Sequence, residues 1–539
     1  MEEKKVQLLD CTLRDGAYIV DANFGTPAIK GIIQKMQDAN IEIIECGWLK
    51  NTEHTEGTTF YHTPDDLSQY VIQHNPDVTY VVMIDWDRYN LEYLPTCTHN
   101  SVDAIRVVFP YGKHKEGIEV AKKIKKKGYG IYLQAANTLA YSDEDLKNLA
   151  KCINDLNPIA ISIVDTFGAM YEEDLDRIIN VLNAELNPEI KMGFHSHNNQ
   201  QLSFALCMHF IKIMDRLGRA CIVDGSLCGM GRGAGNATTE LVASYLNRKY
   251  HANYDMNSIM DAIDTYMEGF KENYRWGYST PYFIAGMYCC HVNNIAYLLK
   301  NHRTNAKNMR NIIESLSADD RKKYDYDLLE KKYIENQGRE IDDTNAIEKI
   351  KSVIGKREVL LVAPGKTADE QYDKISQYIK ENNPVVIGVN AINTKYNFDF
   401  LIFINSVRYD YAKTTYFDVF SNTPKILLSN IKTKGTENEY IVNFNRAVKY
   451  GWEHFDNAVI FTLRLLLHLH VKNIKLAGFD GFKHEYNASY ADASLPTLNP
   501  DDKWDELNEE IKEIFRDLKE TTDGRMDIQF LTDSIFDEK

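Results

Sequence analysis

Short apolar runs alternate with longer amphipathic stretches through the first 240 or so residues. The runs are rich in β-branched residues and have the length of buried strands; they span 6–13, 41–49, 79–85, 104–111, 130–137, 159–166, 191–198 and 220–227. Between them, stretches such as 26–40, 115–128 and 142–157 place apolar residues three and four positions apart, as helices packed on a sheet do. Eight strand–helix units predict an α/β fold, a (β/α)8 TIM barrel, although an open doubly wound sheet has the same local pattern.

A second α/β pattern begins near residue 357. Its apolar runs span 358–365, 384–391, 398–405, 425–430, 473–481 and 527–533, and they predict a Rossmann-like parallel sheet. Residues 301–356 between the modules carry many charges and few apolar positions, which predicts exposed helices. We therefore expect a barrel domain over 1–300 with a helical addition from about 250, a charged helical linker or cap over 301–356, and a Rossmann-like α/β domain over 357–539.

Composition and charge narrow the function classes. The formal net charge of the 539 residues is −16, which argues against nonspecific binding to nucleic acid. No apolar run has the roughly 20 residues of a membrane span. All nine cysteines lie between Cys11 and Cys290 without a CxxC zinc pattern, which favours free thiols in a reducing compartment. We expect a cytoplasmic protein that acts on small molecules, and a homo-oligomer is left open.

Polar side chains gather where the predicted barrel strands end, the end at which barrel enzymes carry their chemistry. They are Arg14 and Asp15, Glu45, Asp85, Gln134 and Asn137, Asp165 and Thr166, His195 and His197, and Asp224. His195 and His197 share one face of their strand because side chains alternate with a period of two. Two imidazoles and the Asp15 carboxylate can share a divalent cation, while Gly16 is expected to permit a tight turn. Singly, each motif is more often structural, so only their joint placement is specific.

Three motifs carry a resemblance to a known family. DCTLRDG (10–16), GFHSHNN (193–199) and GMGRGAGNATTELV (229–242) occur in this order. Together they resemble the metal-dependent aldolases and lyases related to hydroxymethylglutaryl-CoA lyase, with 4-hydroxy-2-oxovalerate aldolase as the nearest group. The resemblance covers roughly residues 5 to 300 and implies a closed barrel.

The resemblance also implies roles for individual residues. The implied ligands of Mn²⁺ or Mg²⁺ are Asp15, His195, His197 and Asn236. Arg14 matches the arginine that steadies an enolate oxygen, and Asp165 and Thr166 match substrate contacts. A tyrosine from the helical addition is expected over the site, with Tyr282 and Tyr288 both candidates. The implied activity is a lyase that makes or cleaves a carbon–carbon bond of a 4-hydroxy-2-oxo acid, with a 2-oxo acid and an aldehyde as partners.

The sequence departs from its relatives two positions after the RDG triplet. Where the aldolases carry a histidine base, this chain has Tyr18, whose side chain ordinarily titrates near ~10. Either Tyr18 relays a proton through water or the substrate differs, and the loop residue His54 is an alternative base. Claisen-type acyl-CoA condensing enzymes carry Glu-Gln after the triplet; Ala17 and Tyr18 lack that pair, which favours an aldolase over this alternative.

Other readings place the function elsewhere. Several strand-like runs of the second module end in a polar residue, at Asn390, Asn405, Asn430 and Asp480. The carboxyl ends of parallel strands line ligand crevices, so a nucleotide or sugar-nucleotide partner is a fair hypothesis. The module faintly resembles sialyltransferase-like domains, which makes a glycosyl or nucleotidyl transferase an alternative. A barrel kept only as a scaffold is disfavoured, because a scaffold has no need of a metal set.

Overall fold

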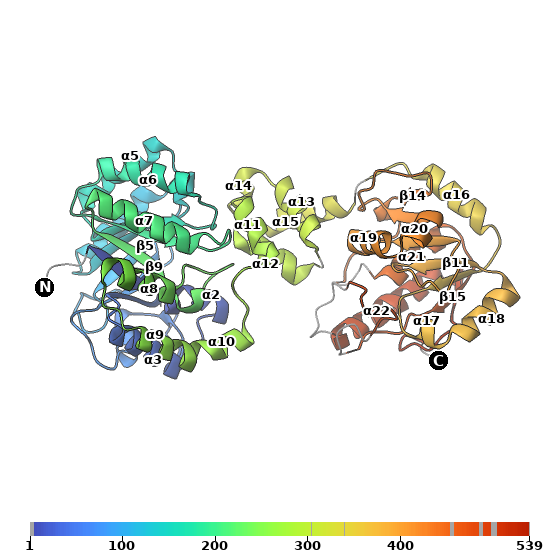
Figure 1. Ribbon diagram of the computed structural model, residues 1–539, viewed down its shortest axis with the longest axis horizontal. Coiled ribbons are helices and arrows are strands. Elements are labelled where there is room, and N and C mark those ends of the chain that lie inside the picture. The colour runs from blue at the N-terminus through green and yellow to red at the C-terminus, as the bar shows by residue number, and fades with distance from the viewer. Residues whose placement is uncertain are drawn as a thin grey trace. The chain divides into compact units, whose positions relative to one another are not determined.

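The chain forms two α/β units, drawn in Figure 1. The structure is a computed structural model that describes residues 5–302, 304–338, 340–452, 457–483, 489–496 and 504–537. One unit comprises Met1–Ile295 and Ala318–Lys323, and the other comprises Ala296–Ser317 and Tyr324–Lys539. The two units are defined by the contacts that residues make within each unit. The domain limits at residues 300 and 356, which were expected from the sequence, remain predictions.

The first unit is a closed barrel of eight parallel strands. The strands are β1 (Val6–Asp10), β2 (Ile43–Leu49), β4 (Thr79–Asp85), β5 (Ala104–Phe109), β6 (Gly130–Ala135), β7 (Ala160–Asp165), β8 (Lys191–Ser196) and β9 (Cys221–Gly225). Each pairs with the next, and β1 closes the ring by pairing with both β9 and β2, while the short β3 (Phe60–Tyr61) extends from β2. The barrel prediction is confirmed, and all eight predicted strands are present.

Helices cover the outside of these strands (Figure 1). They are α3 (Thr26–Asp38), α4 (His114–Lys125), α5 (Asp143–Leu156), α6 (Glu172–Glu185), α7 (Ser203–Leu217) and α8 (Thr239–Tyr250), while the one-turn helices α1 (Thr12–Asp15) and α2 (Ala17–Val20) follow β1 at the carboxyl end of the barrel. The expectation of eight complete strand–helix units is wrong in two places. The connections β2–β4 and β4–β5, which are described throughout, contain no α-helix, only β3 and the 3₁₀ helix η1 (Pro64–Gln69). Pro64 and Pro76 interrupt the first connection and Pro95 interrupts the second, and proline disfavours the interior of a helix.

The barrel interior consists of an apolar layer below a polar one. The apolar layer, near the amino ends of the strands, contains Leu9, Ile43, Val81, Ala104, Tyr132, Ala160 and Ile222. Two residues further along five of these strands lie Glu45, Arg106, Gln134, Ser162 and Asp224, all buried. The period of two in a strand keeps both sets on the inner face. The apolar layer therefore lies below a layer of polar groups, and the polar groups lie directly beneath the carboxyl ends of the strands.

Helices α9 (Met256–Ala262), α10 (Glu268–Asn273) and α11 (Thr280–Met287) follow the barrel. Further along the chain lie α12 (Val292–Asn301), α13 (Ala306–Ser315), α14 (Ala318–Arg321), α15 (Tyr326–Gln337) and α16 (Thr344–Ile354). The charged segment 301–356 is thus largely helical over its described residues.

The second unit contains a seven-stranded parallel sheet. Its order is β14 (Glu439–Val442), β13 (Lys425–Leu428), β12 (Phe400–Phe403), β11 (Val385–Val389), β10 (Val359–Val362), β15 (Asn473–Ala477) and β16 (Asp527–Phe530). The helices are α17 (Thr367–Glu370), α18 (Tyr372–Asn382), α19 (Ser406–Thr415), α20 (Phe417–Asn422), α21 (Ala458–His468) and α22 (Trp504–Thr522). The predicted parallel α/β domain is confirmed with one strand more than expected, the four-residue edge strand β14.

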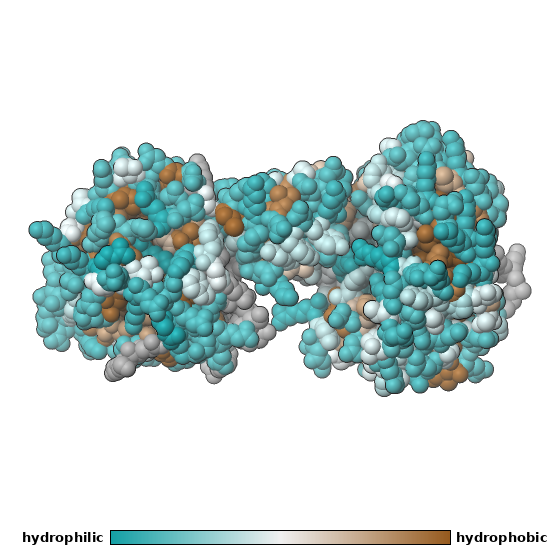
Figure 2. Space-filling model, turned by 180° about the vertical axis from the view of Figure 1, so that it is seen from behind, coloured by the Kyte–Doolittle hydropathy of each residue, from teal (hydrophilic) through white to brown (hydrophobic). Residues whose placement is uncertain are grey.

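Hydrophilic residues cover most of the face shown in Figure 2, with apolar residues in small scattered groups. Among the described residues, no helix is both long enough and apolar enough to cross a membrane. The nine cysteines are free thiols, as expected.

We predict that Arg219→Met destabilises the barrel by about 2 to 4 kcal/mol. The largely buried Arg219 guanidinium donates to the carbonyl oxygens of Leu186, Asn187 and Ile190 at 3.1, 2.8 and 2.9 Å. It thereby provides hydrogen bonds for backbone carbonyl groups of the segment that follows α6. The substitution removes this donor from the carbonyls of the buried Leu186 and Ile190. Urea unfolding checks this value.

Arg177→Met is the matched control, because it removes an arginine from an exposed ion pair with Asp143. Such a pair contributes at most about 1 kcal/mol. Equal stability of the two variants would contradict the role assigned to Arg219.

Candidate metal centre

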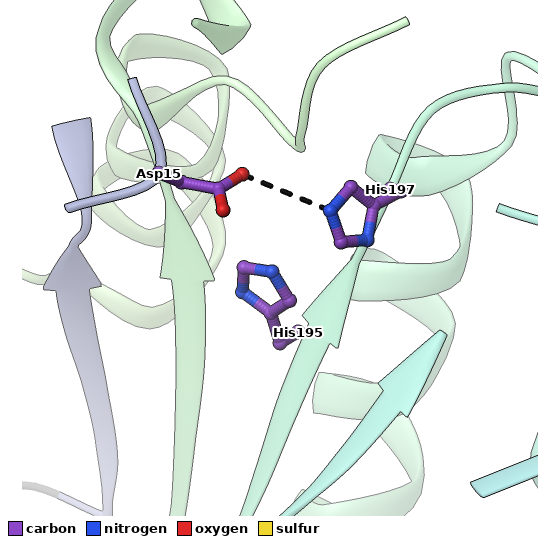
Figure 3. A group of neighbouring side chains, drawn as sticks. All are labelled: Asp15, His195 and His197. Carbon is purple, nitrogen blue, oxygen red and sulfur yellow. Dashed lines mark ion pairs between the residues drawn. The ribbon is translucent and has the colours of Figure 1, made fainter. Parts of the chain in front are cut away.

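Asp15, His195 and His197 meet at the carboxyl ends of the barrel strands (Figure 3). Asp15 lies in the one-turn helix α1 that follows β1, while His195 is in β8 and His197 comes directly after it. One potential ligand atom from each residue lies within 4.8 Å of the other two. All three side chains are largely buried, and Asp15 is only 1% exposed. The predicted cluster is therefore assembled by the fold.

Hydrogen bonds orient both imidazoles for binding a cation. Nδ1 of His195 lies 3.0 Å from the Asp224 carboxylate, and Nδ1 of His197 lies 3.0 Å from the carbonyl oxygen of Asp165. Because each oxygen can only accept, Nδ1 carries the proton and Nε2 of the neutral ring keeps its lone pair. Nε2 of His197 points toward Asp15, at 3.7 Å. Histidine ligands of metals are typically held in this way, so the residues present fit a divalent cation.

The electrostatics of the cluster agree with this arrangement. Burial lowers the pKa of His197 to about 4, although Asp15 opposes the shift, so the ring is neutral near pH 7. Burial alone would raise the pKa of Asp15, but Arg14 and both histidines bring it well below its ordinary value. An ionised carboxylate and a neutral imidazole are the forms in which these groups bind metals.

A continuous chain of buried ion pairs links two of the three candidate ligands. Its members, in order, are Asp15, Arg14, Glu45, Arg106, Asp224 and His195. Glu45 accepts from Nε of Arg14 and from Nη1 of Arg106, both at 2.7 Å. The carboxylates in the chain are thus fixed from both sides. The polar layer of the barrel interior provides the middle of this chain.

Asn236, the fourth implied ligand, lies beside the cluster. Its Nδ2 donates to Oδ2 of Asp15 at 2.7 Å, while its Oδ1 is buried without a partner among the described residues. In this orientation Asn236 positions the carboxylate, and its role as a ligand stays a prediction. Gly231 leaves room for the side chains of Asn236 and Asp15 to meet, because a Cβ at this position would overlap both of them.

Glycine is needed at position 16 for a different reason from the tight turn that the sequence suggested. Its φ of −63° is ordinary helical backbone that any residue can adopt, so no special turn is needed. A Cβ at Gly16 would instead lie 2.9 Å from Sδ of Met230 and 3.0 Å from the ring of Phe24. Glycine is required here by close packing.

The cluster opens into a cavity of about 730 Å³ that Arg14, Tyr18 and Thr166 also line. Oγ1 of Thr166 accepts the N–H of Asn137 at 2.6 Å. Tyr18 is 44% exposed, with the Arg232 guanidinium 3.7 Å from its ring centre. Desolvation of its hydroxyl nevertheless raises its pKa, so the phenolate that could accept a proton is scarcer at neutral pH.

Other residues predicted from the sequence do not line this cavity. The Asp165 carboxylate accepts the N–H groups of Ala169 and Met170, and burial raises its pKa to about 7. Tyr282 and Tyr288 are not among the lining residues, so their contact with a substrate stays a prediction. Both ring nitrogens of His54 are engaged elsewhere, with the carbonyl oxygen of Phe60 and the hydroxyl of Tyr70.

Sequence reasoning missed three residues of the site. Arg106 was the most accessible to prediction, because an arginine inside the apolar strand 104–109 needs a buried partner. Arg232, from the glycine-rich motif, and His291, from the helical addition, both line the cavity. No local pattern distinguishes His291 from a surface histidine.

The fold and the site together define a (β/α)8-barrel enzyme whose chemistry centres on a candidate divalent-metal site. Residues 97–265 match the profile of the HMGL-like family. The 4-hydroxy-2-oxovalerate aldolase of Chloroflexus aurantiacus is 27% identical over 273 residues, which cover 48% of this chain and 75% of that protein. The oxaloacetate decarboxylase of Mycobacterium tuberculosis is 25% identical over 275 residues, covering 49% and 76%.

Among solved structures, the HMG-CoA lyase of Bacillus subtilis aligns with a TM-score of 0.39 and 16% identity, over 50% of this chain and 96% of that chain. The family match and the curated relatives confirm the predicted resemblance. Residues 97–265 thus form an HMGL-like domain, and the chain is a carbon–carbon lyase.

We predict that His195→Ala weakens Mn²⁺ binding at least ~100-fold, since it deletes one of three candidate ligands. Asp224→Asn keeps the ligands but weakens the hydrogen bond that orients His195, so a 10- to 100-fold loss is expected, roughly as for other such partners. Calorimetric titration of the full chain with Mn²⁺ and Mg²⁺ measures both.

His209→Ala provides the control, because His209 pairs with Asp176 on helices outside the cluster. Unchanged Mn²⁺ affinity in His195→Ala would show that the metal binds elsewhere.

Proposed function

We propose that the barrel is an aldolase dependent on Mn²⁺ or Mg²⁺ that makes or cleaves a carbon–carbon bond of a 4-hydroxy-2-oxo acid through a pyruvate-type enolate. The observation that carries this proposal is the cluster of Asp15, His195 and His197, with imidazole lone pairs oriented for a cation, beside Arg14 in one cavity. The 4-hydroxy-2-oxovalerate aldolases among the relatives support it.

In the cleavage direction the 4-hydroxyl loses its proton, the C3–C4 bond breaks and an aldehyde leaves. The electron pair of that bond becomes the enolate of the 2-oxo acid, which is then protonated at C3. A divalent cation supplies Lewis-acid stabilisation of negative charge on the 2-oxo group. Asp15, His195 and His197 would hold it.

Arg14 stabilises the enolate oxygen in this proposal. Its guanidinium lines the cavity and is fixed by Glu45 and Asp15, so it does not need to reorganise as charge develops. A positioned cation of this kind lowers a barrier by several kcal/mol, roughly the effect of one oxyanion-hole donor. Thr166 lines the same cavity and is placed to contact the substrate.

Proton transfer from the 4-hydroxyl is the step that the site supports least. The raised pKa of Tyr18 disfavours its acting as a base, so it acts as a relay through water. Burial lowers the pKa of His291 to about 3, and its Nδ1 accepts the N–H of Asn293 at 3.1 Å. A neutral ring in that state carries its proton on Nε2, so His291 is suited to donating a hydrogen bond to the aldehyde oxygen.

Decarboxylation of a 3-carboxy-2-oxo acid is the second candidate function. Loss of CO₂ leaves the same enolate but removes no hydroxyl proton, so it does not require the base that Tyr18 replaces. The oxaloacetate decarboxylase among the relatives supports this alternative. The two functions share the metal cluster and Arg14 and differ only in the proton acceptor.

We predict that the protein exchanges the methyl protons of pyruvate with D₂O when Mn²⁺ or Mg²⁺ is present and not after chelation. Proton NMR follows the loss of the methyl signal. Arg14→Lys is expected to slow this exchange about 100-fold, since a single ammonium replaces the planar guanidinium.

Arg177→Met should exchange at the wild-type rate because Arg177 lies on the outer face of the barrel. If calorimetry shows bound metal and pyruvate still does not exchange, the pyruvate enolate is excluded.

We predict that Tyr18→Phe separates the two candidate functions. Loss of a proton relay should slow aldol cleavage by about 10² or more and leave oxaloacetate decarboxylation unchanged. Aldehyde release and CO₂ release are measured on the same preparation. A variant that cleaves 4-hydroxy-2-oxovalerate at the wild-type rate would contradict the relay role.

A further inference from the structure

The order of the second sheet reverses between β10 and β15. Strands β11 to β14 lie to one side of β10, whereas β15 and β16 lie to the other. At such a switch point the loops after the two central strands leave in opposite directions, which creates a crevice at their carboxyl ends. The loops here are 363–365 and 478–481, and they line a cavity of about 120 Å³.

Glycines bring the two loops into contact. The N–H of Gly365 donates to the carbonyl oxygen of Gly478 at 2.9 Å, and a Cβ at Gly365 would overlap that oxygen and the Asp480 carboxylate. Gly478 has a φ of +71°. The cavity floor is therefore backbone, with room for a compact group but not for further side chains.

A buried arginine that has no described carboxylate within ion-pair distance lines this cavity. Its side chain hydrogen-bonds with Tyr490, and the charge of Asp492 attracts it from further away. Arg408, in the first turn of α19, is only 8% exposed and lies over the ring of Tyr490, 4.8 Å from its centre. Its Nη1 has no hydrogen-bond partner among the described residues, and none of their carboxylates lies within 4.0 Å. A buried cation is costly unless an anion shares its site.

The two nearby carboxylates are engaged by other donors. Asp480 accepts from the N–H and the hydroxyl of Thr367, and Asp492 accepts from the hydroxyls of Tyr411 and Tyr416 at 2.9 and 2.7 Å. Burial also raises the pKa of Asp480, so this carboxylate is protonated more readily and repels a bound anion less. Arg408 therefore remains available.

Two helix amino ends add to the positive potential. Helix α19 begins after Asn405 and helix α21 after Asn457, and both asparagines line the cavity. The amino end of a helix carries a partial positive charge that favours anions. Asn390 completes the lining: its Oδ1 accepts the N–H of Ile404 at 3.1 Å, which leaves Nδ2 as a donor.

We propose that this crevice binds a small phosphorylated molecule, with its phosphate held by Arg408, Asn390 and the amino ends of α19 and α21. A phosphate has enough acceptor oxygens for several converging donors, and guanidinium groups bind it with strong charge-assisted hydrogen bonds. The volume suits one phosphate group, so the rest of the ligand extends along Phe482 and Tyr490 at the cavity wall. The site is independent of the barrel chemistry.

Calorimetric titration of the full chain tests this site with inorganic phosphate, a nucleoside diphosphate and citrate. The phosphorylated probes are expected to bind and citrate is not. Tighter binding of the nucleoside diphosphate identifies a nucleotide as the ligand, and equal affinity identifies a smaller phosphate ester. Absence of phosphate binding, or equal binding of citrate, would overturn the assignment.

Arg408→Met keeps the apolar length of the side chain and removes its charge, so phosphate affinity should fall at least ~10-fold. Lys413→Met is the matched control, because it removes a cation from the exposed face of the same helix. Equal loss in both variants would refute a specific site.

Hydrogen exchange of the wild-type chain gives a test that needs no variant. Bound phosphate should slow amide exchange in residues 405–409 and 457–461, and unchanged exchange there under saturating phosphate would place the ligand elsewhere.

Discussion

The buried chain of alternating charges is the constraint on which the barrel site depends. It runs through the interior from one candidate ligand to another, by way of Asp15, Arg14, Glu45, Arg106, Asp224 and His195. Isolated buried charges would be strongly destabilising, so each member requires its neighbours. Its three carboxylates exceed its two guanidiniums by one negative charge when the imidazoles are neutral. A divalent cation between Asp15 and the histidines is the counter-charge that this imbalance favours.

The layered interior explains why this polar chain is tolerated. The apolar layer from Leu9 to Ile222 closes the barrel below, while the carboxyl ends of the strands are open to the cavity above. Glu45 and Arg106 occupy the first inward positions above that floor. Desolvation at this depth strengthens every interaction within the layer and fixes the orientation of Arg14 and His195 before a substrate binds.

The strands, the barrel and the metal cluster could be predicted because each depends on a local period or an identifiable motif. His195 and His197 are two residues apart, and Asp15 follows a strand whose place in a barrel is fixed by topology. The two connections without helices and the edge strand β14 could not, because prolines interrupt both connections and β14 has only four residues, next to polar ones. The orientation of the Asn236 amide likewise depends on Asp15, 221 positions away.

The two units create sites by opposite electrostatic means at equivalent places. In the barrel, an excess of buried negative charge faces the ends of β1 and β8 and favours a cation. In the second unit, the buried Arg408, whose Nη1 has no partner among the described residues, lines the cavity at the ends of β10 and β15 and favours an anion. Both exploit the carboxyl edge of a parallel sheet, where loops converge and helices begin. A net buried charge, negative in the barrel and positive at Arg408, is therefore the feature that identifies each candidate site, because a ligand of opposite charge offsets its desolvation.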